Sequence, residues 1–107
     1  MDELEYRVLL FDFYGEMLTT GQRETYEEHV MEDLTVSEIA QNRGVSRQAV
    51  SDLIKRTEKI LEGYENKLGL VARFQRIREK TARISEFARQ EGQDVLADMI
   101  SAIPEDM

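Results

Sequence analysis

Residues 36–55, VSEIAQNRGVSRQAVSDLIK, contain a complete helix-turn-helix pattern. Just before and within this stretch, Thr35 and Glu38 have the spacing of a capping box, which predicts that the first helix begins between them. We expect Gly44 to end that helix, because glycine readily takes the left-handed conformation that turns the chain sharply. Ser46 follows at once and is a favourable N-cap for a second helix. The pattern therefore predicts two helices joined by a very short turn.

The small and apolar residues of this stretch fit the same interpretation. Ala40 lies four residues before Gly44, at the point where a larger side chain would hold the two helices apart. Val45, Val50 and Leu53 are expected to form the apolar side of the turn and of the second helix. The alternative is an ordinary helical hairpin with a glycine turn. Both caps, the small residue and the apolar spacing coincide, so we favour the helix-turn-helix.

This geometry alone does not establish DNA binding, which depends on what the second helix exposes. Its outward positions carry polar and basic side chains that can hydrogen-bond base edges or phosphates. We expect the partner to be double-stranded DNA or structured RNA. The predicted nucleic-acid-binding residues are Arg43, Arg47, Gln48, Ser51, Asp52, Lys55 and Arg56.

Length and composition limit the remaining classes of protein. The chain of 107 residues has no Cys, one His and one Pro, and its long apolar patterns of period 3.6 predict an all-α fold. No apolar run approaches the ~20 residues of a membrane span, and the acidic start does not resemble a signal peptide. We therefore predict a cytoplasmic protein. No catalytic constellation, phosphate loop or metal-ligand cluster is present in the sequence, so we expect no enzyme, no metal and no cofactor.

The net charge of −8 is unusual for a protein that binds nucleic acid, but it is unevenly distributed. Residues 1–40 hold 11 acids and 2 bases, residues 41–90 hold 6 acids and 12 bases, and residues 91–107 hold 5 acids and no base. A local basic surface can still meet phosphate, since screening acts over roughly 8 Å at physiological salt. The acids Glu27, Glu28 and Glu32 form either a simple solvated face or a docking surface for a basic partner.

Apolar periodicity divides the chain into two predicted domains. Residues 1–68 should form a four-helix core, with a first helix at about 3–18, a second beginning after Thr19, and the two helices of the motif. Residues 69–107 should form a C-terminal helical extension that packs on this core or on a dimer partner. We expect its last helix at 95–103 and a tail from Pro104 onward.

Two apolar stripes suggest a homodimer, because together they exceed what one small core obviously uses. One stripe comprises Leu9, Phe13 and Met17 in the first helix. The other continues through the extension at alternating spacings of four and three residues. An intramolecular hairpin that buries all of them is the alternative. The second stripe consists of Leu70, Phe74, Ile77, Thr81, Ile84 and Ala88.

Residues 10–70, from LFDFYGEMLTT to ENKLGL, closely resemble the YlxM-type family of small bacterial proteins inferred to bind DNA. The motif within them is also similar to region 4 of the sigma-70 factors, whose helix-turn-helix reads promoter DNA. The resemblance implies a regulatory protein tied to the signal recognition particle pathway, a link based on neighbouring genes for the particle's GTPase. Two functions follow as hypotheses. One is a nucleic-acid-binding regulator, and the other is a protein adaptor that binds components of the particle.

Overall fold

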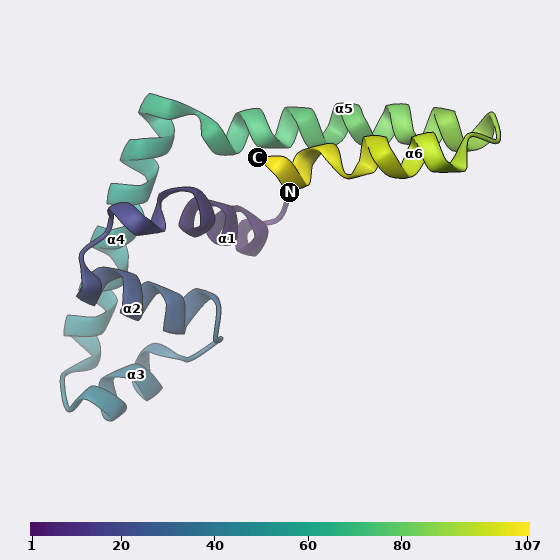
Figure 1. Cartoon of the computed structure of the whole chain (residues 1–107). Helices are drawn as coiled ribbons and strands as arrows, with labels where there is room; N and C mark the ends of the chain where they lie inside the picture. The colour runs from purple at the N-terminus through teal and green to yellow at the C-terminus, as the bar shows by residue number, and fades with distance from the viewer. The chain divides into compact units, whose positions relative to one another are not determined.

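The computed structural model describes residues 1–107 as helices and short connections without strands, which confirms the predicted all-α fold. The chain divides into two compact units, Met1–Gly69 and Leu70–Met107, each of which is described by itself. Figure 1 shows the helices of each unit along the chain. None of these helices has both the length and the apolar character needed to cross a membrane.

The first unit contains four α-helices and one short 3-10 turn. The first helix is shorter than the predicted 3–18: it ends at Tyr14, and the chain then tightens into a 3-10 turn that the N–H of Leu18 closes on the carbonyl of Gly15 at 3.1 Å. The predicted end was wrong because apolar spacing does not distinguish an α-helix from a 3-10 continuation. The elements are α1 (Glu3–Tyr14), η1 (Gly15–Met17), α2 (Thr20–Val30), α3 (Val36–Arg43) and α4 (Arg47–Leu68).

Side-chain caps fix where α2 and α3 begin. At α3, Thr35 Oγ1 accepts from the N–H of Glu38 at 3.1 Å, and Glu38 Oε1 accepts from the N–H of Thr35 at 3.2 Å. Thr19 and Gln22 make the same reciprocal pair at the start of α2. Each pair satisfies two backbone donors that a helix N-terminus leaves open. The capping box that was read from Thr35 and Glu38 is thus confirmed.

The turn of the motif also has the predicted geometry. Gly44 is left-handed, with φ of 67°, and Ser46 Oγ caps α4 by accepting from the N–H of Ala49 at 3.1 Å. The apolar contact beneath the turn differs from the expectation in two residues: Val45 is 48% exposed and Leu53 is only half-buried, and Ile54 is in the core instead. Val45 and Leu53 line a shallow hollow with Thr25 and Arg43 rather than entering the core. The buried cluster consists of Ile39, Ala40, Val50 and Ile54.

The remaining core of the first unit holds α1 and α2 against the long helix α4. Leu10, Tyr26 and Leu61 are almost completely buried there. Tyr26 stacks on the ring of Phe11, with the ring centroids 5.9 Å apart. Each such side chain contributes on the order of 1.5–3 kcal/mol by leaving water. The core therefore fixes the α4 face that points inward, and so also the face that remains outward.

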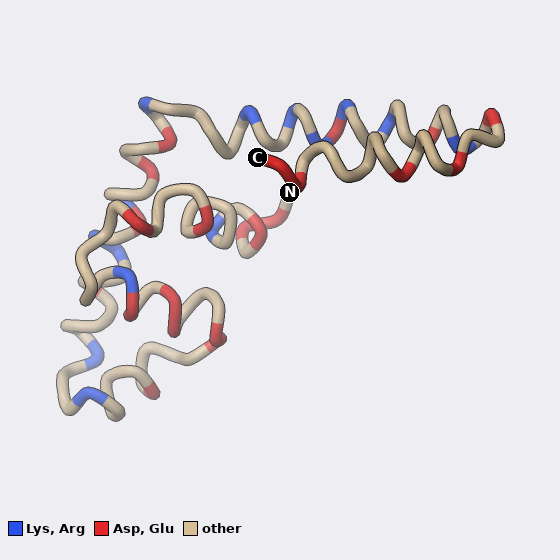
Figure 2. Tube along the Cα trace, in the orientation of Figure 1, with Lys and Arg blue, Asp and Glu red and all other residues tan.

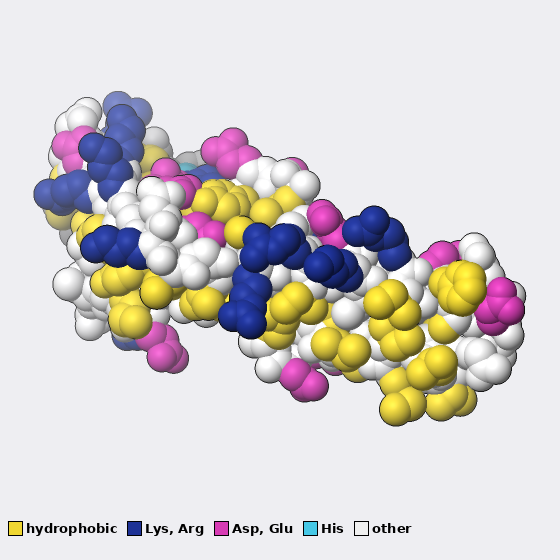
Figure 3. All heavy atoms as spheres, turned by 90° about the horizontal axis from the view of Figure 1, so that it is seen from above, with side chains coloured by type: hydrophobic (Ala, Val, Ile, Leu, Met, Phe, Trp, Pro, Cys, Tyr) yellow, Lys and Arg dark blue, Asp and Glu magenta, His cyan; other side chains and the backbone are white.

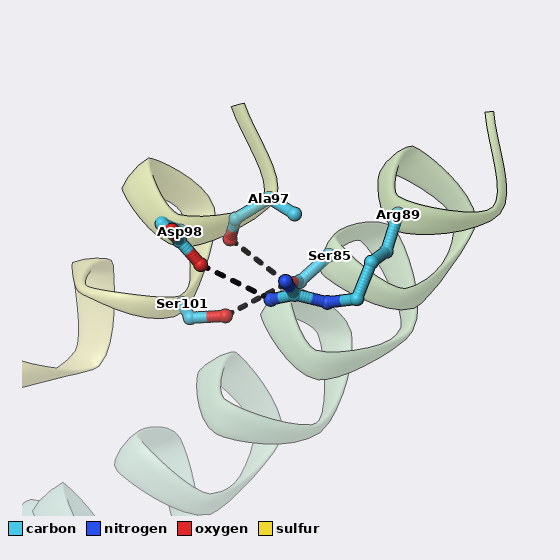
Figure 4. Close-up of polar contacts among 5 residues, drawn as sticks. All are labelled: Ser85, Arg89, Ala97, Asp98 and Ser101. Carbon is cyan, nitrogen blue, oxygen red and sulfur yellow. Dashed lines mark hydrogen bonds and ion pairs between the residues drawn. The ribbon is translucent and has the colours of Figure 1, made fainter. Parts of the chain in front are cut away.

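The second unit is an antiparallel hairpin of two helices. Small residues form its inner contact: Ser85 Oγ donates to the carbonyl of Ala97 at 2.8 Å and lies 2.7 Å from Ser101 Oγ (Figure 4). Arg89 pairs with Asp98 at 3.2 Å on one side of this contact. The expected end was partly wrong: the last α-helix stops at Ser101 rather than at residue 103, and Ile103–Asp106 form a 3-10 turn in place of an irregular tail. The elements are α5 (Leu70–Gln90), α6 (Asp94–Ser101) and η2 (Ile103–Asp106).

Candidate nucleic-acid interface

One stripe of polar and basic side chains runs along the outward face of α4. Gln48, Asp52, Lys55 and Lys59 follow each other at spacings of four, three and four residues, which places them on the same side of a helix. All four are exposed. The buried residues of α4 lie on the opposite side, against α1, α2 and α3. The core of the first unit thus presents this stripe to solvent over the first three turns of α4.

The N-terminal end of the stripe is already organised by a side-chain bond. Gln48 Nε2 donates to Asp52 Oδ1 at 2.8 Å, one helical turn further along. This contact leaves the amide oxygen of Gln48 and the second carboxylate oxygen of Asp52 available. Arg47 is exposed beside them in the first turn of α4 and makes no hydrogen bond or ion pair within the chain. Donors and acceptors are therefore presented together at the helix start.

The basic residues further along α4 are free, whereas its neighbouring acids are engaged. Glu58 forms an ion pair with Arg7 of α1, and the hydroxyl of Tyr6 donates to Glu62 at 2.8 Å. Burial of the phenol, together with the hydrogen bond and charge of Glu62, raises the pKa of Tyr6 well above its usual range. The carboxylates of α4 beyond Asp52 thus interact with α1 rather than with the bases.

A positive surface results on the exposed face of α4. Lys55, Lys59 and Asp52 give the stripe a formal charge of +1 in a protein whose total is −8, and Arg47 and Arg56 add a base on each of its two flanks. Figure 2 shows the bases of α4 against the acids of the helices around it. Lys59 was not among the predicted residues, although its spacing of four from Lys55 would have identified it. The bases are Arg47, Lys55, Arg56 and Lys59.

Two of the predicted residues lie apart from this stripe. Arg43, at the end of α3, donates to Thr25 Oγ1 at 2.7 Å and pairs with Glu28 at 3.1 Å, so its guanidinium joins α3 to α2. Ser51 is half-buried and lies toward one edge of the face. The spacing of the sequence could not reveal the contact of Arg43, because its partners are 15 and 18 residues earlier in the chain. The structure brings together Gln48, Asp52 and Lys55. Arg47 and Arg56 are nine residues apart and so lie on opposite flanks of this stripe, and Arg56 lines a shallow hollow that also includes Arg43.

The acidic residues considered for partner docking also divide into two kinds. Glu27 and Glu32 are exposed on and just after α2. Glu28 is half-buried and bonded to Arg43, so its charge is neutralised within the unit. Only Glu27 and Glu32 are therefore available to a partner without a change in the packing of α2 on α3.

A groove of about 710 Å³ lies between α1 and the second half of α4. Its charged side chains include both signs: Arg7 pairs with Glu58, and Glu62 accepts from the hydroxyl of Tyr6. Glu3, Lys55 and Lys59 also line the groove and make no ion pair. No group of three His, Cys, Asp or Glu side chains in the chain is arranged to hold a metal ion. Lys55 and Lys59 thus belong both to the exposed stripe and to the wall of this groove.

The fold and the exposed stripe define an all-α protein with a helix-turn-helix. Residues 1–99 match the family UPF0122, described as "Putative helix-turn-helix protein, YlxM / p13 like", and the chain belongs to this family. The resemblance found in the sequence is thereby confirmed. Among its relatives is a UPF0122 protein of Caldanaerobacter subterraneus subsp. tengcongensis, 44% identical over 79% of this chain and 73% of its own.

Two further relatives extend the match. A UPF0122 protein of Limosilactobacillus reuteri is 47% identical over 82% of this chain and 79% of its own length. A UPF0122 protein of a Geobacillus species is 43% identical over 90% of this chain and 89% of its own. The similarity to the Geobacillus protein extends well beyond the helix-turn-helix, over 98 residues, and so includes most of the C-terminal hairpin.

Proposed function

We propose that the protein is a non-enzymatic, nucleic-acid-binding regulator whose helix α4 enters the major groove of double-stranded DNA. The observation that carries this proposal is the exposed stripe of Gln48, Asp52, Lys55 and Lys59 on the second helix of a helix-turn-helix. The major groove admits an α-helix, and the second helix of this motif normally lies in it. The family description supports the helix-turn-helix, and the roles of the residues are our inference.

The two halves of the stripe would act differently on a duplex. Arg47 and Gln48 lie in the first turn of α4, from which helix-turn-helix proteins usually contact base edges. Lys55, Arg56 and Lys59 lie two to three turns further on, where the helix leaves the groove and phosphate is closer. Base contacts would supply sequence preference, and phosphate contacts would supply most of the affinity.

The net negative charge of the protein weakens its binding to DNA without preventing it. Residues 1–40 carry a formal charge of −9, and such a field repels DNA over a distance of roughly one Debye length, about 8 Å at physiological salt. Glu28, Glu58 and Glu62 are bonded within the first unit and so contribute less to the surface beside α4. We expect binding to be weaker than that of a wholly basic helix-turn-helix and to depend strongly on salt.

The test is a titration of fluorescently labelled duplex DNA with the full chain at several salt concentrations, read by anisotropy. The logarithm of the binding constant should fall linearly with the logarithm of the salt concentration. Lys59→Ala should weaken binding and lower the slope by about one. Lys67→Ala, at the far end of α4, is the matched control and should behave like the parent. Absence of any salt-dependent binding would refute the proposal. Binding only to a folded RNA hairpin would identify structured RNA, rather than DNA, as the partner.

A second candidate function is a protein adaptor in the signal recognition particle pathway. The observation that favours it is the acidic surface of Glu27 and Glu32, since the RNA-binding parts of such a particle are basic. Purified particle GTPase, with and without its RNA, should then bind the parent but not the double variant Glu27→Lys, Glu32→Lys. The double variant Glu86→Lys, Glu91→Lys, at two exposed acids of the second unit, changes the charge by the same amount and is the control. Equal binding by all three proteins would remove this candidate.

A further inference from the structure

An apolar surface covers one face of the α5–α6 hairpin. We call it the hairpin face. Its side chains come from both helices at spacings of three and four residues, so they point to the same side of the hairpin. Figure 3 shows hydrophobic side chains gathered over this unit. Phe87 is 64% exposed, Met99 is 65% exposed, and the others are about half exposed or more. The face consists of Ile84, Phe87, Leu96, Met99 and Ile103, with Val95 at its edge.

The fully buried residues where α5 meets α6 are small, namely Ser85, Ala88 and Ala97. The larger apolar residues Phe74, Ile77 and Ile100 of these helices are only half-buried. The Arg89–Asp98 pair lies beside this contact (Figure 4). Two helices that place their large side chains on one outer face need a further layer to bury them. The hairpin face therefore has the character of half of a helical bundle.

A basic stripe borders the hairpin face on α5. Arg73, Arg76, Lys80 and Arg83 recur at spacings of three, four and three residues, and Figure 3 shows basic side chains in a row beside the hydrophobic ones. The last residues of the chain are acidic instead, with Glu105 and Asp106 in η2. Lys80 and Arg83 make no ion pair within the chain. The two helices of the hairpin thus carry opposite charges at their edges (Figure 2).

We propose that the hairpin face is covered by the hairpin face of a second copy of this chain, so that two hairpins form a four-helix bundle. A two-fold axis parallel to the helices places α5 of one copy on α6 of the other. This arrangement brings the basic stripe near Lys80 to the acidic end of the partner's α6 and η2. A two-fold axis perpendicular to the helices would instead place α5 on α5 and set basic stripes against each other.

The size of the face agrees with a dimer. Six large side chains that are half to three-quarters exposed amount to roughly 600 Å² of apolar surface, at the upper end of the largest patch on a typical monomer. A stable interface buries about 800 Å² per protomer, and about 65% of a homodimer interface is apolar, which requires roughly 500 Å². The hairpin face alone supplies this apolar area. The proposal goes beyond nucleic-acid binding and does not depend on it.

The first test is the mass of the full chain in solution, measured by sedimentation equilibrium over a range of concentrations. The parent should give twice the 12.5 kDa of one chain at micromolar concentration. Phe87→Glu and Met99→Glu should each weaken dimerisation by roughly tenfold or more, because a charge would be buried in the interface. Both positions are exposed in the single chain, so these variants should retain the helical circular dichroism of the parent.

Met17→Glu is the matched control. Met17 is 61% exposed in the first unit, nearly the same as Met99, and it belonged to the other stripe considered for a dimer. This variant should dimerise like the parent. A parent that remains a monomer, or a Met17→Glu variant that dissociates while Met99→Glu does not, would overturn the proposal. Monomers that bind vesicles of anionic lipid through Phe87 and Met99 would also overturn it, because the occupant would then be a membrane surface.

The second test concerns the arrangement of the two copies. Lys80→Glu should weaken dimerisation by several-fold, and adding Glu105→Lys to the same chain should restore it, because the swapped charges again face each other across the interface. Failure of the second substitution to restore dimerisation would exclude the arrangement of α5 on the partner's α6. Neither residue lies on α4. DNA titrations of the same variants therefore show separately whether the proposed nucleic-acid binding holds.

Discussion

Arg43 donates a hydrogen bond across 2.7 Å to the hydroxyl of Thr25, and this bond joins the last residue of α3 to the middle of α2. Thr25 is almost completely buried, while the Arg43 side chain is about one-third exposed. The first helix of the motif is therefore held by a polar contact as well as by apolar packing. Because the recognition helix α4 follows Arg43 after only three residues, this contact helps to set the direction in which α4 begins.

The first prediction is that Arg43→Ala lowers the stability of the protein. The substitution removes a charged hydrogen bond to Thr25 and the ion pair with Glu28, and we expect a loss of about 1–2 kcal/mol in the free energy of unfolding, since the side chain is partly exposed. Urea unfolding measures the loss. In the Thr25→Val background the same substitution should cost less, because the acceptor is already absent.

An unchanged stability for Arg43→Ala, combined with weaker DNA binding, would contradict this interpretation. Arg43 would then contact nucleic acid directly, as the sequence alone suggested. The measurement of both properties on one variant therefore decides between the two roles of this residue.

The second prediction concerns the turn of the motif. Gly44 has φ of 67°, and nothing lies within 4 Å of a Cβ added there, so the cost of Gly44→Val should come from backbone strain alone. We expect a loss of about 1–3 kcal/mol, because a β-branched residue rarely takes this conformation. Gly63→Ala is the control: it also has open space but lies inside α4, and it should raise stability by about 0.5–1 kcal/mol. Thermal unfolding of the two variants should shift in opposite directions.

The third prediction is a loss of stability at high pH. The pKa of Tyr6 is raised in the folded protein by burial and by the hydrogen bond to Glu62, so the folded state holds the phenolic proton more tightly than the unfolded chain. The resulting stabilisation is complete below the unfolded pKa of about 10 and is lost as the pH rises above that value. Urea unfolding at a series of alkaline pH values should show this decline.

Tyr6→Phe identifies the group responsible. It should be less stable than the parent at neutral pH by about 1 kcal/mol, because the bond to Glu62 is missing, and its stability should fall less steeply above about pH 10. Burial also raises the pKa of Tyr26, so this variant should still lose some stability at high pH. Equal slopes for Tyr6→Phe and the parent would assign the effect to other groups.

The helix-turn-helix could be predicted from the sequence because local interactions specify it. The capping box at Thr35, the left-handed Gly44 and the N-cap Ser46 each act within three or four residues, and the structure has all three. The exposed stripe on α4 follows from the helical period once the buried side is known. Lys59 was omitted only because the predicted site ended at Arg56.

Features that depend on distant residues could not be predicted. The bond of Arg43 to Thr25 and the pairing of Glu58 with Arg7 join positions 18 and 51 residues apart. The hairpin face differs from the predicted apolar stripe for the same reason. Thr81 and Ala88 of that stripe are buried, whereas Phe87, outside the stripe, is exposed. Which apolar residues remain exposed depends on how α6 packs on α5, and periodicity alone does not determine that packing.

The last prediction is a division of roles along α4 on duplex DNA. Gln48→Ala should cost about 1–3 kcal/mol on the preferred sequence and reduce discrimination between sequences, because Gln48 lies where base edges are read. Lys55→Ala should weaken binding to all sequences alike and lower the salt slope by about one. In the parent, Gln48 Nε2 donates to Asp52 Oδ1 at 2.8 Å, and Asp52→Asn keeps an acceptor for this bond. The substitution removes a negative charge that faces phosphate, so it should strengthen binding to every duplex. If all three variants bind like the parent while the Glu27→Lys, Glu32→Lys protein loses its protein partner, α4 is a structural support and the adaptor function replaces the regulator.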